Sequence, residues 1–472
     1  MSLSAAINTA QSIFSNTGQQ TAIVSKNIAN SGNADYVRRL AMMGIDSEGS
    51  YYIKIQRAQN EALFKQNIAS ISGASAQTRL LDGLTQMQSV FGGNEYASSP
   101  STYLAKFRSS LQTYAASPGN ITIASSTIAD AKDLAYSIST SATAVQNIRA
   151  DADKEILEQV GTLNGYLTQF ETVNNEIVGN LATGKDASDA LDQRDKLLKQ
   201  IAEIVGISTV TRSNMDTVIY SADGTVLFET LARKVTFTPS PNFDATVTGN
   251  PVYVDGVALK AGTGGNTTSE GTLASLVQIR DDIAPKMQSQ LDEVARMLVT
   301  MFQENAGPGL FTWTGGTIPA AGTIEPGIAA SLKVNPLAEA DPTMLRDGGF
   351  NGVVSNTSGS AGYTTLLDGF IVAMDTTQSF DINADLGGSA SIMTYASSSI
   401  GWLEQLRKSA STSNDNKTAM LAQTQQALSN ETGVSLDEEL ALMLDLEQSY
   451  KASAKLLSTV DEMLTTLLNT VR

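Results

Sequence analysis

The sequence MLDLEQSYKASAKLLSTVDEMLTTLLNTV, residues 443–471, places an apolar or small side chain at alternating intervals of three and four positions. Such a repeat aligns one side chain per turn in a single stripe, the pattern of a coiled-coil seam. The stripe consists of Met443, Leu446, Tyr450, Ser453, Leu457, Val460, Leu464, Leu467 and Val471. Because it is narrow and partly polar, the predicted helix needs a partner helix to cover it.

The opposite end of the chain has a matching stripe, which predicts a helix over residues 2–30. Its members are Leu3, Ile7, Ala10, Phe14, Thr17, Thr21, Val24 and Ile28. Residues 30–33, Asn-Ser-Gly-Asn, tolerate a left-handed backbone and end the helix. We call the two stripes the terminal seams and expect each to pack on the other end of the chain or on a neighbouring copy. The candidate subunit-interface residues are Leu3, Ile7, Ala10, Phe14, Val24, Ile28, Met443, Leu446, Tyr450, Leu457, Val460, Leu464 and Leu467.

Composition limits the chemistry and the partners of the chain. Its 472 residues suffice for two to four domains, and they include no Cys and no His. Thiolate nucleophiles, imidazole bases and the commonest metal ligand are therefore missing. We expect no enzymatic activity, no cofactor and no metal site. The net charge of −17 disfavours a nucleic-acid partner. No apolar stretch approaches the length of a membrane span, and the N-terminus lacks the pattern of a cleaved signal peptide.

Between the two ends, the residue pattern predicts a mainly α-helical chain with one inserted small β domain. Helical spacing covers most of residues 55–205 and 272–430, which we expect to form a long helical bundle. Residues 206–271 are rich in Thr and Val, alternate, and contain an Asp223-Gly224 hairpin signal. Residues 1–54 and 431–472 form the third expected domain, in which the N- and C-terminal segments pack together.

Charged residues suggest ion pairs and helix caps instead of catalysis. Asp192 and Asp195 share one side of a predicted helix and Arg194 points elsewhere, so a structural role is favoured over an acid–base set. Asp281 and Asp282 form an isolated pair, which is weak evidence for a cation site. Either Ser188 or Asp189 is expected to cap the helix that follows.

Two further charged segments lie close to the predicted terminal helices. Residues 435–438, Ser-Leu-Asp-Glu, have the form of a capping box that starts the C-terminal helix. Arg38 and Arg39 follow the N-terminal helix and are either solvated or paired with Glu438 and Glu439 of neighbouring chains.

Several of these motifs resemble those of the bacterial flagellar axial proteins. Residues 25–30, Ser-Lys-Asn-Ile-Ala-Asn, with Asp35-Tyr36 and Arg38, are similar to the N-terminal signature of that family. Residues 433–439 and 450–464 are similar to its C-terminal signature. Residues 190–198, with the sequence LDQRD inside them, and residues 271–281 resemble landmarks of the hook-associated members, which join the hook to the filament. Where that family has Thr-Pro-Gly-Tyr, this chain has Asn33-Ala34-Asp35-Tyr36.

The resemblance implies a structural subunit of the extracellular flagellum, exported without a cleaved signal peptide. It implies copies of the same chain in a helical ring, the hook protein and the next hook-associated protein as partners, and an export chaperone at the C-terminal segment. A hook or rod subunit and a secreted coiled-coil adhesin remain alternatives. An enzyme site in the Gly-rich stretch 262–271 is disfavoured because no catalytic set accompanies it.

Overall fold

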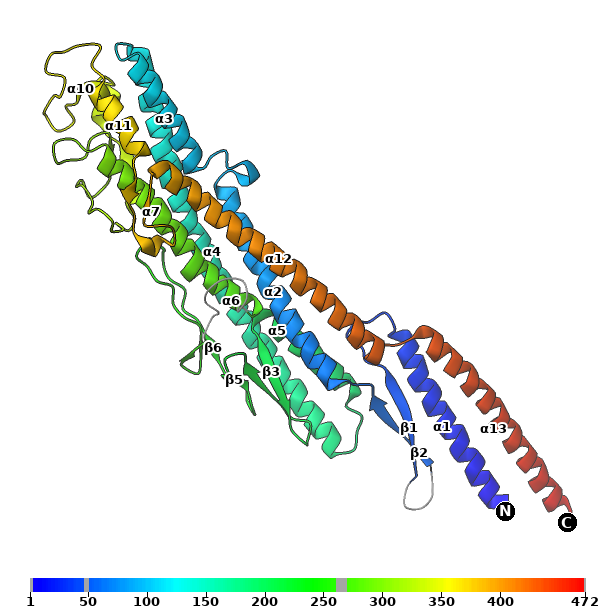
Figure 1. Cartoon of the computed structure of the whole chain (residues 1–472). Helices are drawn as coiled ribbons and strands as arrows, with labels where there is room; N and C mark the ends of the chain where they lie inside the picture. Colours follow the sequence, from blue (N-terminus) through cyan, green and yellow to red (C-terminus); the bar gives the residue numbers. More distant parts are fainter. Residues whose placement is uncertain (1–2, 46–50, 260–269, 471–472) are drawn as a thin grey trace. The chain divides into compact units, whose positions relative to one another are not determined.

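Long α-helices dominate the computed structural model, which describes residues 3–45, 51–259 and 270–470 (Figure 1). The predicted mainly α fold with small β elements is confirmed. The 3-4 repeats and the stop signals place helices close to where the sequence predicted them. The α-helices are α1 (Leu3–Ala29), α2 (Glu61–Val90), α3 (Pro100–Ala116), α4 (Ile121–Ala182), α5 (Ser188–Ile204), α6 (Gly271–Gln278), α7 (Ala284–Met301), α8 (Ile328–Ser331), α9 (Pro336–Ala340), α10 (Met344–Asp347), α11 (Thr365–Asp375), α12 (Ile392–Thr432) and α13 (Leu436–Thr470).

Short antiparallel strands connect these helices. The largest ladder is the hairpin of β1 (Arg39–Ile45) and β2 (Tyr51–Arg57), in which Arg39 pairs with Arg57. The predicted start of a helix at Ile55 is therefore wrong, because residues 55–57 complete β2 and α2 begins at Glu61. Two-residue strands form the smallest ladders, β9 (Phe311–Thr312) with β10 (Lys333–Val334) and β11 (Gln378–Ser379) with β12 (Ser389–Ala390).

The stretch predicted as one β domain contains two separate three-stranded sheets. The first comprises β3 (Ile207–Thr211), β4 (Thr217–Ser221) and β5 (Val226–Phe228). Its β4–β5 turn holds Asp223 and Gly224, as the hairpin signal predicted, and Gly224 has φ +87°. The second comprises β6 (Val235–Thr236), β7 (Tyr253–Val254) and β8 (Val257–Ala258). Pro239, Pro241 and Pro251 lie between β6 and β7, where a missing N–H prevents a continuous ladder.

Contacts divide the chain into two compact units. The first unit consists of residues 1–72, 163–234 and 418–472, and the second of residues 73–162 and 235–417. The two sheets fall in different units, because residue 234 ends one and residue 235 begins the other. The terminal helices α1 and α13 both belong to the first unit.

The second unit contains the large apolar core. Side chains of α3, α4, α7, α11 and α12 contribute to it, and Phe302 lies at an aromatic cluster. The Phe302 ring is 5.5 Å from Phe107, 5.2 Å from Phe311 and 4.5 Å from Phe370, measured between ring centroids. Contacts of this kind add about 0.5–1.5 kcal/mol per pair beyond area burial. This core makes the second unit a self-sufficient scaffold.

Two buried arginines hold the β6–β7 connection in the second unit. Arg280 donates to Asp153 at 2.5 Å and to the Asn250 carbonyl at 2.9 Å, and Arg149 donates to the Asp244 and Val247 carbonyls. A Cβ atom at Gly249 would lie 2.3 Å from the Arg280 guanidinium, so only glycine fits there. The landmark at residues 271–281 thus has a packing role. It ends in a π-helical turn, Ile279–Ile283, that separates α6 from α7.

Candidate assembly site at the chain termini

The terminal seams face each other within one chain. Helices α1 and α13 lie side by side and antiparallel, with both chain ends at the same end of the pair (Figure 1). The rings of Phe14 and Tyr450 meet at a centroid distance of 4.6 Å. The seam positions that are buried are Ala10, Thr17, Val24, Leu446, Ser453 and Val460. Those that are half-buried are Ile7, Thr21, Ile28, Met443, Leu457 and Leu464. The side chains of Leu3, Leu467 and Val471 lie outside the described residues.

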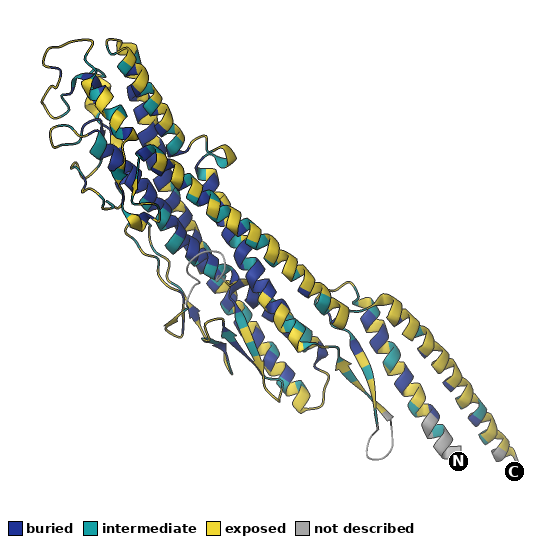
Figure 2. Ribbon diagram, in the orientation of Figure 1, coloured by how far each residue is buried: buried dark blue, intermediate teal, exposed yellow. Residues whose placement is uncertain are grey.

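The seam leaves most of α13 uncovered. Figure 2 shows α13 as a largely exposed helix, in contrast to α7 of the second unit, which is mostly buried. Large apolar side chains off the seam, among them Leu440, Leu444, Leu456 and Met463, are more than half exposed. A row of exposed apolar residues of this size is typical of a protein–protein contact surface. The pairing within one chain therefore uses only part of the apolar surface of the terminal helices.

Asn27 connects the end of α1 to the start of α13. Its side-chain amide donates to the Arg39 carbonyl at 2.9 Å and to Glu439 Oε2 at 3.1 Å. Its Oδ1 accepts from the Tyr36 hydroxyl at 2.8 Å and from the Arg39 amide at 3.1 Å. Asn27 and Glu439 are both 1% exposed, so these bonds form in a nearly dry environment. Every hydrogen-bonding group of a buried amide is used here, which stabilises one arrangement of the two termini.

Arg38 binds the first turn of α13 in the same chain. Its Nε is 2.7 Å from Glu439 Oε1, and its Nη1 is 2.7 Å from Glu438 Oε2. The expectation that Glu438 and Glu439 pair with arginines of neighbouring chains is therefore wrong for Arg38 in this structure. The predicted capping box is only half formed: the Glu438 amide lies 3.5 Å from Ser435 Oγ, and the Glu438 carboxylate binds Arg38 instead of reaching back.

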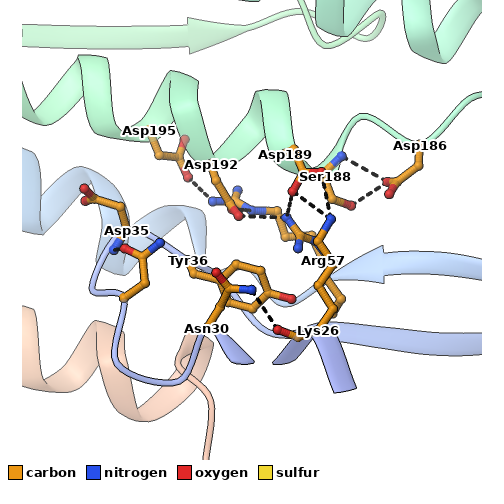
Figure 3. A network of polar contacts seen from close by, with 12 residues as sticks. Lys26, Asn30, Asp35, Tyr36, Arg57, Asp186, Ser188, Asp189, Asp192 and Asp195 are labelled. Atoms are coloured by element: carbon orange, nitrogen blue, oxygen red, sulfur yellow. Dashed lines mark hydrogen bonds and ion pairs between the residues drawn. The ribbon is translucent and has the colours of Figure 1, made fainter. Parts of the chain in front are cut away.

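Arg39 and Arg57 are anchored by three aspartates of α5 (Figure 3). Asp189, Asp192 and Asp195 are spaced by three residues and share one face of the helix; we call them the aspartate row. Arg39 Nη2 lies 2.7 Å from Asp189 and 2.9 Å from Asp192. Arg57 Nε lies 2.7 Å from Asp192, and its Nη2 lies 2.6 Å from Asp195. Two arginines directly opposite in a ladder repel each other, and the aspartate row offsets that repulsion.

Burial makes this anchor sensitive to the loss of any member. The side chains of Arg39 and Arg57 are 1% and 8% exposed. The Arg39 guanidinium also lies 4.3 Å from the centroid of the Tyr36 ring, a cation–π contact. Burial raises the pKa of Asp192 despite the neighbouring arginines, and burial likewise raises the pKa of Tyr36. At Asp189 burial is outweighed by the hydrogen bond from Lys26 and the charge of Arg39, so its pKa is lowered.

The surroundings of the aspartate row agree with a structural role. Arg194 points away from it and donates to the Met215 carbonyl at 2.7 Å, as its position on the helix predicted. The predicted cap at Ser188 or Asp189 is wrong. Asp186 accepts a hydrogen bond from the Ser188 amide at 3.0 Å, and the Asp189 carboxylate forms ion pairs with Lys26 and Arg39. Beside the row lies a shallow hollow lined by both cations and anions, including Lys26, Asp35 and Lys196.

The remaining charged candidates show no chemistry beyond ion pairing. Asp281 pairs with Arg280, and Asp282 pairs with Lys286. Within residues 3–45, 51–259 and 270–470, no group of three or more His, Cys, Asp or Glu side chains is arranged to hold a metal ion. Most of the Gly-rich stretch 262–271 lies outside the described residues. None of the described helices is long and apolar enough to span a membrane.

Sequence reasoning identified the terminal seams and the LDQRD helix but not the contacts of Asn27 or the anchoring of Arg57. A signal for the anchor is present in hindsight. Arg39 and Arg57 stand at the two ends of the β1–β2 hairpin, and three aspartates recur at helical spacing further along the chain. Equal numbers of residues flank the hairpin tip on both sides, which brings the two arginines opposite each other.

Comparison with known proteins gives a consistent family for this architecture. Residues 84–316 match the model of the flagellar hook-associated protein FlgK helical domain, and residues 424–470 match that of the flagellar basal body rod FlgEFG protein C-terminal region. Flagellar hook-associated protein 1 of Bacillus subtilis is 25% identical over 369 residues, covering 70% of this chain and 68% of the relative. The Escherichia coli protein of the same name is 24% identical, covering 65% of this chain and 58% of the relative.

A solved structure has the same fold. The flagellar hook junction protein FlgK from Burkholderia pseudomallei aligns with a TM-score of 0.59 at 13% identity, covering 77% of this chain and 99% of the other. The two family models together span the helical middle and the C-terminal helix, and the terminal seams and the LDQRD helix supply the remaining landmarks. The chain belongs to the family of flagellar hook-associated protein 1.

Proposed function

We propose that this chain is a structural subunit of the junction between the flagellar hook and the flagellar filament, without enzymatic activity. The observation that carries the proposal is the antiparallel pair of α1 and α13, joined by a half-polar seam and by the buried Asn27–Glu439 bond. In this proposal the two terminal helices of each subunit together line the tube, and the α1–α13 pair brings both chain ends to the same position. The helical middle of the chain disfavours the alternative of a hook subunit.

Copies of the chain assemble as a helical ring through their terminal helices. Heterologous contacts of this kind propagate along a helix instead of closing into a dimer. The terminal-seam residues support the ring by joining α1 and α13 into one layer, and the exposed apolar residues of α13 remain for contacts between copies. One end of the ring meets the hook protein and the other meets the next hook-associated protein.

Export precedes assembly in this proposal. The chain leaves the cell and joins the extracellular flagellum. An export chaperone binds the C-terminal segment, residues 436–470, and covers its exposed apolar side chains until the subunit is exported. Such a helix buries its apolar face in the groove of a partner.

The test is electron microscopy of cells that lack this gene, together with a blot of the medium for flagellin. Bare hooks with flagellin shed into the medium are the expected result, and a plasmid copy of the gene must restore filaments. Missing hooks would move the protein to the hook or the rod. Intact filaments in the deletion strain would remove it from the flagellum.

A further inference from the structure

The β1–β2 hairpin presents apolar side chains that nothing in the described structure covers. On one face of the ladder stand Leu40, Met42 and Tyr52, which are 37%, 47% and 48% exposed. Arg39 and Arg57 anchor the hairpin only at its base. An isolated two-stranded hairpin is marginally stable in water, and a packed face stabilises it. The part of the hairpin beyond the arginines therefore gains stability from a partner.

The start of α13 carries a second uncovered surface. Leu436, Leu440 and Leu444 recur every four residues and are 47%, 51% and 61% exposed. We call these three residues the leucine row. Leu444 is two positions from the seam residue Leu446, which is about 200° around the helix, so Leu444 lies off the seam. Leu436, seven positions before Met443, lies close to the line of the seam, and the row leaves the seam toward Leu444.

The two surfaces lie on different sides of α1. Helix α1 contacts β1, β2 and α13, and Figure 1 shows it between the hairpin and α13. When a second copy is placed beside the first in the same orientation, the hairpin of one copy adjoins α13 of the other. A contact between different surfaces of identical chains is heterologous and repeats along a ring or a helix.

The charges of the hairpin and of α13 also favour a contact between these two surfaces. The strands β1 and β2 contain three basic residues and no acidic residue, whereas α13 contains seven acidic and two basic residues. Two of the three cations are used by the aspartate row. Lys54, opposite Met42 in the ladder, forms no ion pair among the described residues, and neither do Asp437 and Asp445 beside the leucine row. Two copies of the acidic helix α13 would repel each other. The hairpin, which is apolar and basic, is instead complementary in charge to α13, which is apolar and acidic.

We infer that the β1–β2 hairpin of one subunit packs on the leucine row of α13 in the adjacent subunit, and that this is the contact that propagates the ring. The inference rests on the proposed function and names the two surfaces of its self-association. Met42 and Tyr52, which share one face of the hairpin with Lys54, supply apolar contact to Leu440 and Leu444, and Lys54 meets the acidic residues beside them. The occupant of each surface is a second copy of this chain.

Cysteine cross-linking tests the contact, because the chain contains no cysteine of its own. The full-length chain with Met42→Cys and Leu444→Cys is expressed as the sole copy, and sheared flagella are treated with a bismaleimide reagent. The expected result on a denaturing gel is a ladder of dimers, trimers and larger species. Each single variant gives no ladder, and co-expression of the two single variants gives dimers only. If the double variant forms no filaments, Tyr52→Cys with Leu440→Cys probes the same contact.

The matched control pairs Met42→Cys with Ser449→Cys, an exposed position on the same helix about 140° away from Leu444. This pair is expected to give no ladder. Absence of the ladder in flagella that carry filaments would overturn the inference while leaving the junction role intact. A cross-linked band of another mass, or a faster-migrating monomer linked within itself, would also overturn it. Failure of the proposed function would instead be visible as normal filaments in the deletion strain.

Discussion

Asn27 and Glu439 are 412 positions apart in the sequence and are joined by a hydrogen bond of 3.1 Å in a buried environment. This bond connects the end of α1 to the first turn of α13, where Arg38 also binds the Glu439 carboxylate. An acidic residue in the first turn of a helix also suits the positive end of the helix dipole. The Glu439 carboxylate thus stabilises the N-terminal end of α13 and also joins α13 to the end of α1.

Asn27→Ala is expected to loosen this junction. The substitution leaves the Arg39 amide and carbonyl, the Tyr36 hydroxyl and one Glu439 oxygen without their partner, in buried surroundings. The expected loss in free energy of unfolding of the terminal helices is about 2–3 kcal/mol. Hydrogen exchange of the α1 and α13 amides in isolated flagella, where the terminal helices are assembled, measures this loss. Asn30→Ala is the control, because the Asn30 side chain binds only the Lys26 carbonyl of its own helix at an exposed site, and it should change exchange little.

Asp192→Asn is expected to release the hairpin from α5. The substitution removes the one carboxylate that contacts both Arg39 and Arg57 and leaves two nearly buried cations under-neutralised. Breaking such a pair costs about 3 kcal/mol. Hydrogen exchange of the β1 and β2 amides in isolated flagella measures the loss. Asp133→Asn is the control, since Asp133 forms an exposed ion pair with Lys106 whose loss costs about 1 kcal/mol or less. Equal effects of the two substitutions would contradict the buried anchor.

Asp292 is expected to make the second unit less stable as the pH rises. Burial raises the pKa of Asp292 from 3.8 to about 6, although the Gly327 and Ala329 amides donate to its carboxylate. The folded chain therefore holds a proton that the unfolded chain loses near pH 3.8. The stabilising contribution is complete below pH 3.8, falls as the pH rises through about 6, and changes no further above that value.

The comparison of wild type with Asp292→Asn isolates this group. Between about pH 4 and pH 7 the free energy of unfolding of the wild type should fall relative to the variant by up to about 3 kcal/mol. Urea unfolding at several pH values measures the difference. Asp82→Asn, at an exposed position of α2, is the control and should track the wild type. A difference between wild type and Asp292→Asn that is constant with pH would disprove the assignment.

The long helices were predictable because a 3-4 repeat over eight or nine turns has only one regular interpretation. The terminal seams and the start of α13 near Ser435 follow from local pattern and helix capping alone. The seams also implied a partner helix, although the pattern does not distinguish the same chain from a neighbour. That choice depends on the turn after Asn30 and on the Asn27–Glu439 bond, neither of which leaves a periodic signal.

The β region was predicted less well for a related reason. Alternation of Thr and Val identifies strands, but it does not state which strands share a sheet. In this chain Arg149 and Arg280 bind carbonyls of residues 244–250, and this connection lies in the second unit while β3–β5 lie in the first. The burial of Arg39 was likewise hidden, because arginine is usually exposed and its two aspartate partners on α5 lie 150 and 153 positions away in the sequence.

The terminal helices are expected to be disordered in the free monomer before assembly. Their seam contains Thr17, Thr21 and Ser453, and large apolar side chains of α13 stay exposed in the paired arrangement. Burial on this scale does not offset an ordering cost of about 1–2 kcal/mol per residue for the backbone. Limited trypsin digestion should remove residues before about Arg57 and after about Glu431 and leave the second unit intact. Full protection of both ends in a chain shown to be monomeric would refute this expectation.

Leu464→Asp is expected to block ring formation while leaving the helical bundle folded. Leu464 is a half-buried seam residue near the end of α13, and a carboxylate there would be desolvated without a partner. Cells that carry only this variant should have bare hooks, and the purified variant should keep its helical circular dichroism. Thr465→Asp, which adds the same charge at the next, exposed position, is the control and should support filaments. Normal filaments from Leu464→Asp would show that the seam is not needed for assembly and would leave the hairpin and the leucine row as the surfaces on which the ring depends.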